Sequence, residues 1–155
     1  MGSKIETRLN ELGITLPKPA APAANYVPYV VSGNLIFVAG QIPVLNGEIK
    51  FKGRLGEDMS IEDGYKAARL CGLNIIAQAG AAAGDLDRIK RIVKLGGFVG
   101  CTADFTDHPK VVNGASDLMV EIFGEPAGQH ARFAVGAPSL PLGVAVEVDA
   151  VIEIA

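Results

Sequence analysis

The chain has 155 residues, of which 49% are hydrophobic and 20% are charged, a composition that excludes a disordered protein and favours one globular domain. The formal net charge of −3 argues against a dedicated nucleic-acid binder, because such proteins usually carry a strong basic excess. Two cysteines are too few for a disulfide framework.

The sequence indicates a cytoplasmic protein. The N-terminus lacks the charged region, apolar run and small-residue cleavage site of a secretory signal, so we expect none. We also expect no membrane span, because no apolar stretch is long enough to cross a bilayer. Cys71 and Cys101 are interpreted as reduced thiols, as is usual in the cytosol.

The N-terminal segment has two parts. The run from Ser3 to Glu6 fits a capping box, which predicts a helix over residues 4–12. The proline-rich stretch 17–22 follows as a stiff, extended connector. We therefore expect a helix and arm over residues 1–25 and a single domain over residues 26–155.

The rest of the chain alternates strand and helix signals. The Gly33-Asn34 pair lies between two β-rich runs and predicts a hairpin. Two later segments carry apolar residues at spacings of three and four, as a helix with one buried face requires. The expected elements are strands over 27–31 and 35–39, a short edge strand over 48–52, a helix over 61–82, a strand over 89–98 that could extend to 102, a helix over 107–123, and strands over 131–135 and 144–154.

This order predicts an open sheet with helices on one face. Each of the two main helices joins strands that could lie parallel in one sheet. The opposite face then needs a cover. Because the strands are rich in Val, Ile and Ala, we expect other subunits of the same protein to bury that face.

Two charged residues stand in apolar strands. Glu147 either faces solvent or is buried with a partner, and composition alone favours the solvated alternative. Arg132 offers a planar fork of donors that matches a carboxylate, although a surface arginine is the simpler interpretation. His108, His130 and the two cysteines have no metal-ligand spacing, so a metal site is not expected.

Several stretches, taken together in order and spacing, resemble the YjgF family, the reactive-intermediate imine and enamine deaminases. Arg132 and Glu147 are fifteen positions apart, as are the functional Arg and Glu of that family. The resemblance covers residues 26–154 and leaves the N-terminal helix and arm outside, as in a longer subgroup. The matching stretches are Pro28-Tyr29, Gly33 to Pro43, Ala67-Ala68 with Asn74 and Ala79-Gly80, Asn113, Ala131-Arg132, Leu140-Pro141, and Val146 to Ala150.

The resemblance implies a fold and an architecture. The fold would be α+β, an α/β sandwich of the chorismate mutase-like (bacillus) type, with a mixed sheet and two helices on one face. Three copies would pack their sheets around a common axis as a homotrimer, and ligand pockets would lie at the subunit interfaces. No cofactor and no metal would be needed.

The resemblance also implies an activity, the hydrolysis of a 2-imino or enamine acid to a 2-oxo acid and ammonia. Arg132 would grip the carboxylate of the small-molecule substrate, and Glu147 would position the water. The pocket would also be lined by residues at five further matching positions. These are Tyr29, Ala39, Gly40, Asn113 and Ala134.

Two positions depart from the best-known deaminases of the family. Ala39 stands where they commonly have Ser, and Ala134 where they often have Cys. These changes keep a second hypothesis open, a non-catalytic trimer that binds small carboxylates for sensing or regulation. A third hypothesis is the endoribonuclease activity attributed to some relatives. The acidic charge balance and the lack of paired catalytic histidines weigh against it.

Overall fold

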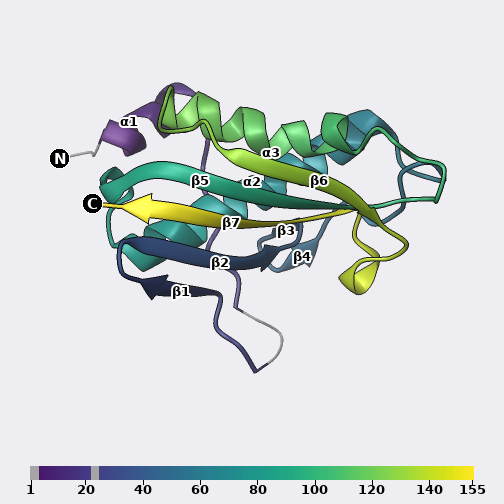
Figure 1. Ribbon diagram of the computed structural model, residues 1–155, viewed down its shortest axis with the longest axis horizontal. Helices are drawn as coiled ribbons and strands as arrows, with labels where there is room; N and C mark the ends of the chain where they lie inside the picture. Colours follow the sequence, from purple (N-terminus) through teal and green to yellow (C-terminus); the bar gives the residue numbers. More distant parts are fainter. Residues whose placement is uncertain (1–3, 22–24) are drawn as a thin grey trace.

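The fold is a five-stranded mixed sheet with helices on one side (Figure 1). The computed structural model describes residues 4–21 and 25–155. The strand order is β1-β2-β7-β5-β6, and only β5 and β6 are parallel neighbours. The strands of this sheet are β1 (Tyr29–Ser32), β2 (Leu35–Gln41), β5 (Ile89–Gly100), β6 (Ala131–Ala137) and β7 (Val146–Ile154).

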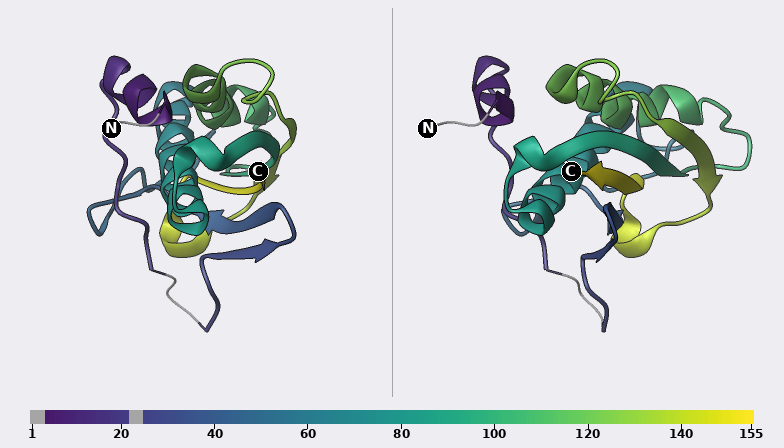
Figure 2. Two further views of the ribbon diagram at one scale, coloured as in Figure 1. Left: turned by 90° about the vertical axis from the view of Figure 1, so that its left-hand side faces the viewer. Right: turned by 60° about the vertical axis from the view of Figure 1, so that its left-hand side comes forward.

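Two helices make the crossovers. Helix α2 (Ile61–Ala83) connects β2 to β5, and α3 (His108–Phe123) connects β5 to β6. Strands β2 and β5 both pair antiparallel with β7 between them, so they run parallel to each other. The predicted arrangement of parallel strands joined by helices is therefore confirmed, as is the α+β fold class with a mixed sheet. Both helices lie on the same side of the sheet (Figure 2).

Local sequence signals explain where α2 begins and ends. The Ser60 hydroxyl accepts a hydrogen bond from the Asp63 N–H at 3.1 Å, which is an N-cap. Gly84 ends the helix in the left-handed region. Helices α2 and α3 approach closely at Gly114, where any Cβ would collide with the backbone carbonyl of Tyr65. The fully buried side chains of both helices fill the space above the sheet.

The N-terminal helix α1 (Lys4–Glu11) is docked on the domain. The carboxylate of Asp87, in the 3-10 turn η1 (Leu86–Arg88), accepts the backbone N–H groups of Lys4 and Ile5, each at 2.9 Å. These are orphan donors of the first helical turn. Ile5 and Leu9 belong to the hydrophobic core. Ser3 and Pro22, which the sequence placed in the helix cap and the arm, lie outside the described residues.

A small ribbon differs from expectation. The sequence predicted an edge strand over 48–52, whereas β4 covers only Glu48–Ile49 and pairs with β3 (Val44–Leu45) apart from the main sheet. The two are joined by Asn46 and Gly47, both with positive φ, as a tight hairpin turn requires. The expected helices differ from the structure by one residue at an end, and the two 3-10 turns were not predicted. Several strand ends also differ: β5 reaches Gly100, β6 reaches Ala137, and β7 begins at Val146.

The face of the sheet opposite the helices is uncovered in one chain and exposes apolar side chains on both sides of the carboxylates of β7. Val30 of β1 pairs with Phe37 of β2, and Phe98 of β5 pairs with Val135 of β6. Each of these four side chains is between 37% and 51% exposed. Exposed apolar side chains gathered on one face favour an interaction site. We call these four residues the open face.

Candidate functional site

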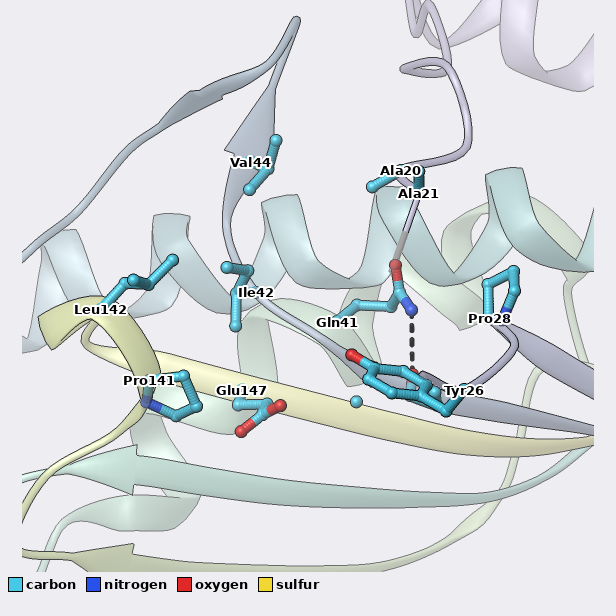
Figure 3. A pocket seen from close by; sticks show the side chains of 12 residues that line it. Ala20, Ala21, Tyr26, Pro28, Gln41, Ile42, Val44, Pro141, Leu142 and Glu147 are labelled. Atoms are coloured by element: carbon cyan, nitrogen blue, oxygen red, sulfur yellow. Dashed lines mark hydrogen bonds between the residues drawn. The ribbon is translucent and has the colours of Figure 1, made fainter. Parts of the chain in front are cut away.

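A cavity of about 340 Å³ lies beside the first half of β7 (Figure 3). Its walls come from the N-terminal arm, the segment before β1, the end of β2, β3, the 3-10 turn η2 (Pro141–Gly143) and β7. Most lining side chains are apolar. The lining residues are Ala20, Ala21, Tyr26, Pro28, Ala39, Gly40, Gln41, Ile42, Val44, Pro141, Leu142 and Glu147.

Glu147 carries the only charge among the described residues that line this cavity. Its side chain is half-buried on the face of β7 that lies away from the helices. Burial raises the pKa of its carboxyl group, and the neighbouring charge of Asp149 raises this pKa further. The simple interpretation of Glu147 as a fully solvated strand residue is therefore wrong. A carboxyl group with a raised pKa is suited to exchanging protons with a ligand.

The backbone of Gly40 lies directly against the Glu147 carboxyl group. A Cβ at position 40 would collide with the Oε2 atom of Glu147, so any larger residue there would have to displace this carboxyl group. The pairing of β2 with β7 is shifted between Val38 and Gln41, which leaves Ala39 and Gly40 in a bulge. Bulges often aim backbone and side chains at functional sites. The structure thus brings together three predicted site residues: Ala39, Gly40 and Glu147.

Arg132 belongs to a second cluster, at the start of β6. Its Nη1 donates to the Oδ1 of Asn113 at 2.8 Å and to the hydroxyl of Ser116 at 3.1 Å. Within the described part of the chain, Nε and Nη2 make no hydrogen bond. The guanidinium is therefore oriented from one side only, which leaves donors for a ligand. Arg132 is thus more than a free surface arginine.

His130 completes this cluster through Ser116. Its Nδ1 lies 2.7 Å from the carbonyl oxygen of Gly128, which can only accept, so Nδ1 carries a proton. In the neutral ring, Nε2 must then accept from the Ser116 hydroxyl, at 2.8 Å. The Ser116 oxygen is left to accept from Arg132. All of these hydrogen bonds can therefore form at the same time, and together they fix the orientation of the Arg132 guanidinium.

Arg132 and Glu147 do not meet within one chain. Arg132 pairs in register with Leu95, whose side chain is buried under the helices, whereas Glu147 pairs with Phe98 on the open face. The two side chains therefore lie on opposite faces of the sheet, with β5 between their strands. One chain thus carries two separate clusters of candidate site residues. We call Glu147, Gly40 and Ala39 the glutamate half-site, and Arg132, Asn113 and Ser116 the arginine half-site.

Two predicted residues lie outside both half-sites. Tyr29 is partly buried against the hydrophobic core, and Tyr26, three positions earlier, lines the cavity instead. Ala134 also packs against the core, in register with Gly97.

Sequence reasoning missed Tyr26, Ser116 and His130. A signal existed for Ser116, which lies three positions after Asn113 and so shares its helix face.

The described residues contain neither a metal-binding cluster nor a membrane-spanning helix. Among residues 4–21 and 25–155, no group of three or more His, Cys, Asp or Glu side chains could hold a metal ion. Within the same residues, none of the helices combines the length and hydropathy needed to cross a membrane.

Comparisons with known proteins agree on one family. Residues 6–154 match the family model "YjgF/chorismate_mutase-like, putative endoribonuclease", a match that includes most of the N-terminal helix and the arm. The chain is 49% identical to Protein TCP17 of Trypanosoma cruzi over 97% of this chain and 94% of the relative.

Solved structures give the same result. The Agrobacterium tumefaciens protein Atu1372, of unknown function, is 48% identical with a TM-score of 0.89, covering 97% of this chain and 93% of that one. TdcF of E. coli with bound serine is 26% identical with a TM-score of 0.63, covering 90% and 98%. The chain therefore belongs to the YjgF/chorismate mutase-like family.

Proposed function

We propose that the protein is a homotrimeric hydrolase that converts reactive 2-imino or enamine acids to 2-oxo acids and ammonia. In this proposal each site is composite, with the arginine half-site of one copy facing the glutamate half-site of its neighbour. The observation that carries the proposal is the placement of Arg132 and Glu147 on opposite faces of one sheet, each with its own supporting residues.

The apolar open face supports assembly. Because Glu147 pairs directly with Phe98 of the open face, a neighbouring copy packed on the open face would lie at the edge of the glutamate half-site. Burial of this surface is a favourable term in association. Assembly would also withdraw Glu147 further from water, and this would raise the pKa of its carboxyl group more.

Arg132 would hold the substrate carboxylate. A guanidinium binds a carboxylate through two parallel N–H donors, and Nε and Nη2 of Arg132 are available for this. The relative TdcF is described with bound serine, which also carries a carboxylate beside an amino-bearing carbon. An arginine fixed by Asn113 and Ser116 would place the adjacent imine carbon at a constant position.

Glu147 would act on water. Its carboxylate takes a proton from a water molecule while the water oxygen bonds to the imine carbon, and it passes this proton to the nitrogen as the C=N π electrons move there. The product is a neutral carbinolamine, and Glu147 is again ionised. The carboxylate then takes the hydroxyl proton and delivers it to the amino nitrogen, so that the C–N bond breaks, the carbonyl forms and ammonia leaves. A raised carboxyl pKa suits this exchange, because it lies nearer the operating pH than that of an exposed glutamate.

The test is ammonia release from imino acids generated in situ by an amino-acid oxidase. Wild type should accelerate release, whereas Arg132→Ala and Glu147→Gln should each lower the rate by about a hundredfold or more. Glu153→Gln is a matched control, because Glu153 lies on the same strand and outside the cavity. No acceleration by wild type with any imine would contradict the proposal.

A second function is favoured by Ala39. It lines the cavity with a methyl group at a position where the deaminases commonly carry a hydroxyl. A site that retains the arginine but lacks such a polar contact could bind carboxylates without turnover, as a sensor. Binding of 2-oxo acids that disappears in Arg132→Ala, together with no release of ammonia from any imine, would support this function over the first.

A further inference from the structure

The N-terminal arm forms part of the wall of the Glu147 cavity. Ala20 and Ala21 line the cavity from the arm, and Tyr26 and Pro28 line it from the segment that leads into β1 (Figure 3). These four residues come before the first strand of the sheet. The cavity therefore has its size and lining only when these four residues lie beside the end of β2.

A buried amide on α2 holds the arm in place. Nε2 of Gln78 donates to the carbonyl oxygen of Ala20 at 2.8 Å, and the Gln78 side chain is only 1% exposed. A buried amide that loses its hydrogen bond carries the full cost of its desolvation. The bond thus favours one position of the arm over others.

A second buried amide holds another wall in the same way. Asn74, one helical turn before Gln78, is 1% exposed, and its Nδ2 donates to the carbonyl oxygens of Ile42 at 3.1 Å and Val44 at 2.9 Å. Residues four apart on a helix lie on one face. A single face of α2 therefore holds two separate chain segments around the cavity, the arm and the stretch after β2.

The stretch before the cavity is also fixed. Ile14 and Leu16 pack against the hydrophobic core, and Pro17 is buried. Pro17 and Pro19 restrict the backbone between the core contacts and Ala20. The arm is thus anchored on the core side by packing and at the cavity by Gln78.

We propose that the arm is the specificity wall of the site, and that Gln78 is its positioning residue. This inference rests on the proposed function for the identity of the ligand, a 2-imino or 2-oxo acid. The wall selects acids whose side chain is apolar and either branched or aromatic. The arm presents the methyl groups of Ala20 and Ala21, and the segment that leads into β1 adds the rings of Tyr26 and Pro28.

The charges around the cavity favour the same class of ligand, acids with an apolar side chain. A charged ligand side chain in this cavity would lose its hydration without a described partner of opposite charge, except for a cation near Glu147. An anionic side chain would also face the Glu147 carboxylate. Dicarboxylic acids should therefore be excluded, and small side chains should leave apolar surface of the cavity unfilled.

Calorimetric binding of four 2-oxo acids tests this inference without requiring turnover. The probes are pyruvate, 4-methyl-2-oxopentanoate, phenylpyruvate and 2-oxoglutarate. Wild type should bind 4-methyl-2-oxopentanoate or phenylpyruvate about tenfold or more tightly than pyruvate, and 2-oxoglutarate more weakly than pyruvate. Equal affinities for pyruvate and the two larger apolar acids would overturn the inference.

Two variants test the arm itself. Ala20→Leu should weaken the binding of the two larger apolar acids about tenfold and change the affinity for pyruvate by no more than about twofold, because the added side chain fills part of the cavity. Gln78→Leu, similar in size but without the donor, should reduce the preference for large acids to about twofold or less. Controls are Ala81→Leu, on an exposed position of α2, and Lys18→Ala, on an exposed position of the arm.

The outcomes separate this inference from the proposed function. Folding of each variant is checked by thermal melting and light scattering. If imines are turned over but neither folded variant changes the ratio of affinities, the arm inference fails and the hydrolase proposal stands. If the ratio changes as expected but no imine is hydrolysed, the hydrolase proposal fails and the arm inference stands. Binding of none of the four acids overturns the arm inference together with the carboxylate site.

Discussion

Arg132 and Glu147 project from opposite faces of one sheet, and β5 lies between the strands that carry them. A site that uses both must therefore draw them from different copies. Arg132→Ala and Glu147→Gln should each be inactive alone, but refolding the two together at equal amounts should restore activity. Random assembly would give an intact arginine and an intact glutamate at about one quarter of the interfaces, hence about a quarter of wild-type activity.

The control for this complementation is each variant refolded by itself. Ammonia release is measured at the same total protein concentration before and after mixing. If a single chain supplied both residues, the mixed sample would stay as inactive as its components, and the composite site would be excluded.

The open face should control assembly. Phe98→Lys places a charge in the apolar surface beside Glu147, where its burial between copies would be strongly unfavourable. We expect a monomer by light scattering and loss of imine hydrolysis, with the monomer still folded. Leu45→Lys is the matched control, because Leu45 is equally exposed at 37% but belongs to the separate β3-β4 ribbon. A Phe98→Lys trimer with full activity would contradict this prediction.

A side chain at position 40 should displace Glu147. In Gly40→Ala the new methyl group collides with Oε2 of Glu147, so the carboxyl group must move or the bulge must open. We expect at least a tenfold fall in kcat, with a smaller change in KM. The reason is that the substitution displaces Glu147, which positions the water, and not Arg132, which binds the substrate carboxylate. Gly80→Ala is the control, since its nearest contact is the tip of the Leu86 side chain at 3.3 Å. Unchanged kcat in Gly40→Ala would argue against a role for Glu147.

The sequence predicted elements well where a local signal existed. The Gly33-Asn34 hairpin, the helix expected over 61–82 and the strand expected over 144–154 followed from such patterns, and the structure confirms all three elements. Strand β3 was missed because two residues are too few to show an alternating pattern. Short pairings of this kind depend on the turn between them and on contacts with the rest of the chain.

The site was predictable only in part. The positions Arg132, Glu147, Gly40 and Asn113 followed from resemblance, but their surroundings did not. Asn113 meets Arg132 only because the crossover through α3 returns that helix over β6. The raised pKa of Glu147 depends on burial by segments far from it in sequence, and no local pattern around the residue carries that information.

The pH dependence of activity should follow Glu147. The base form is required, so kcat/KM should rise with pH through the raised pKa of its carboxyl group. Asp149→Asn removes the neighbouring negative charge that helps to raise the pKa of Glu147. The midpoint of the kcat/KM profile should therefore move to lower pH. Glu153→Gln serves as the control and should leave the midpoint in place. A midpoint that does not respond to Asp149→Asn would assign the titration to another group.

Stability should show the opposite trend with pH. The folded-state pKa of Glu147 lies above its unfolded value, so the folded state binds this proton more tightly. The resulting stabilisation is fully present below the unfolded pKa and is lost as pH rises through the folded pKa. Glu147→Gln should therefore melt at a higher temperature than wild type at about pH 7, and the difference should close at about pH 4. A constant difference across this range would contradict the raised pKa.

The support of Arg132 should appear in substrate affinity. In Asn113→Ala the acceptor at 2.8 Å from Nη1 is lost, and in Ser116→Ala the acceptor at 3.1 Å is lost together with the link to His130. Hydrogen bonds to charged groups contribute about 1.5–3 kcal/mol, so each change should raise KM about tenfold or more. The value of kcat should change less, because Glu147 belongs to the other half-site.

The same two variants also test whether Arg132 binds the substrate carboxylate. Binding of pyruvate, measured by calorimetry, should weaken in both variants by a factor similar to the rise in KM. Asp117→Ala is the control on the same helix, because Asp117 accepts from the Tyr65 hydroxyl, at 2.7 Å, and lies outside the arginine half-site. If Asn113→Ala lowered kcat without weakening pyruvate binding, Asn113 would act on the reacting atoms rather than through the arginine.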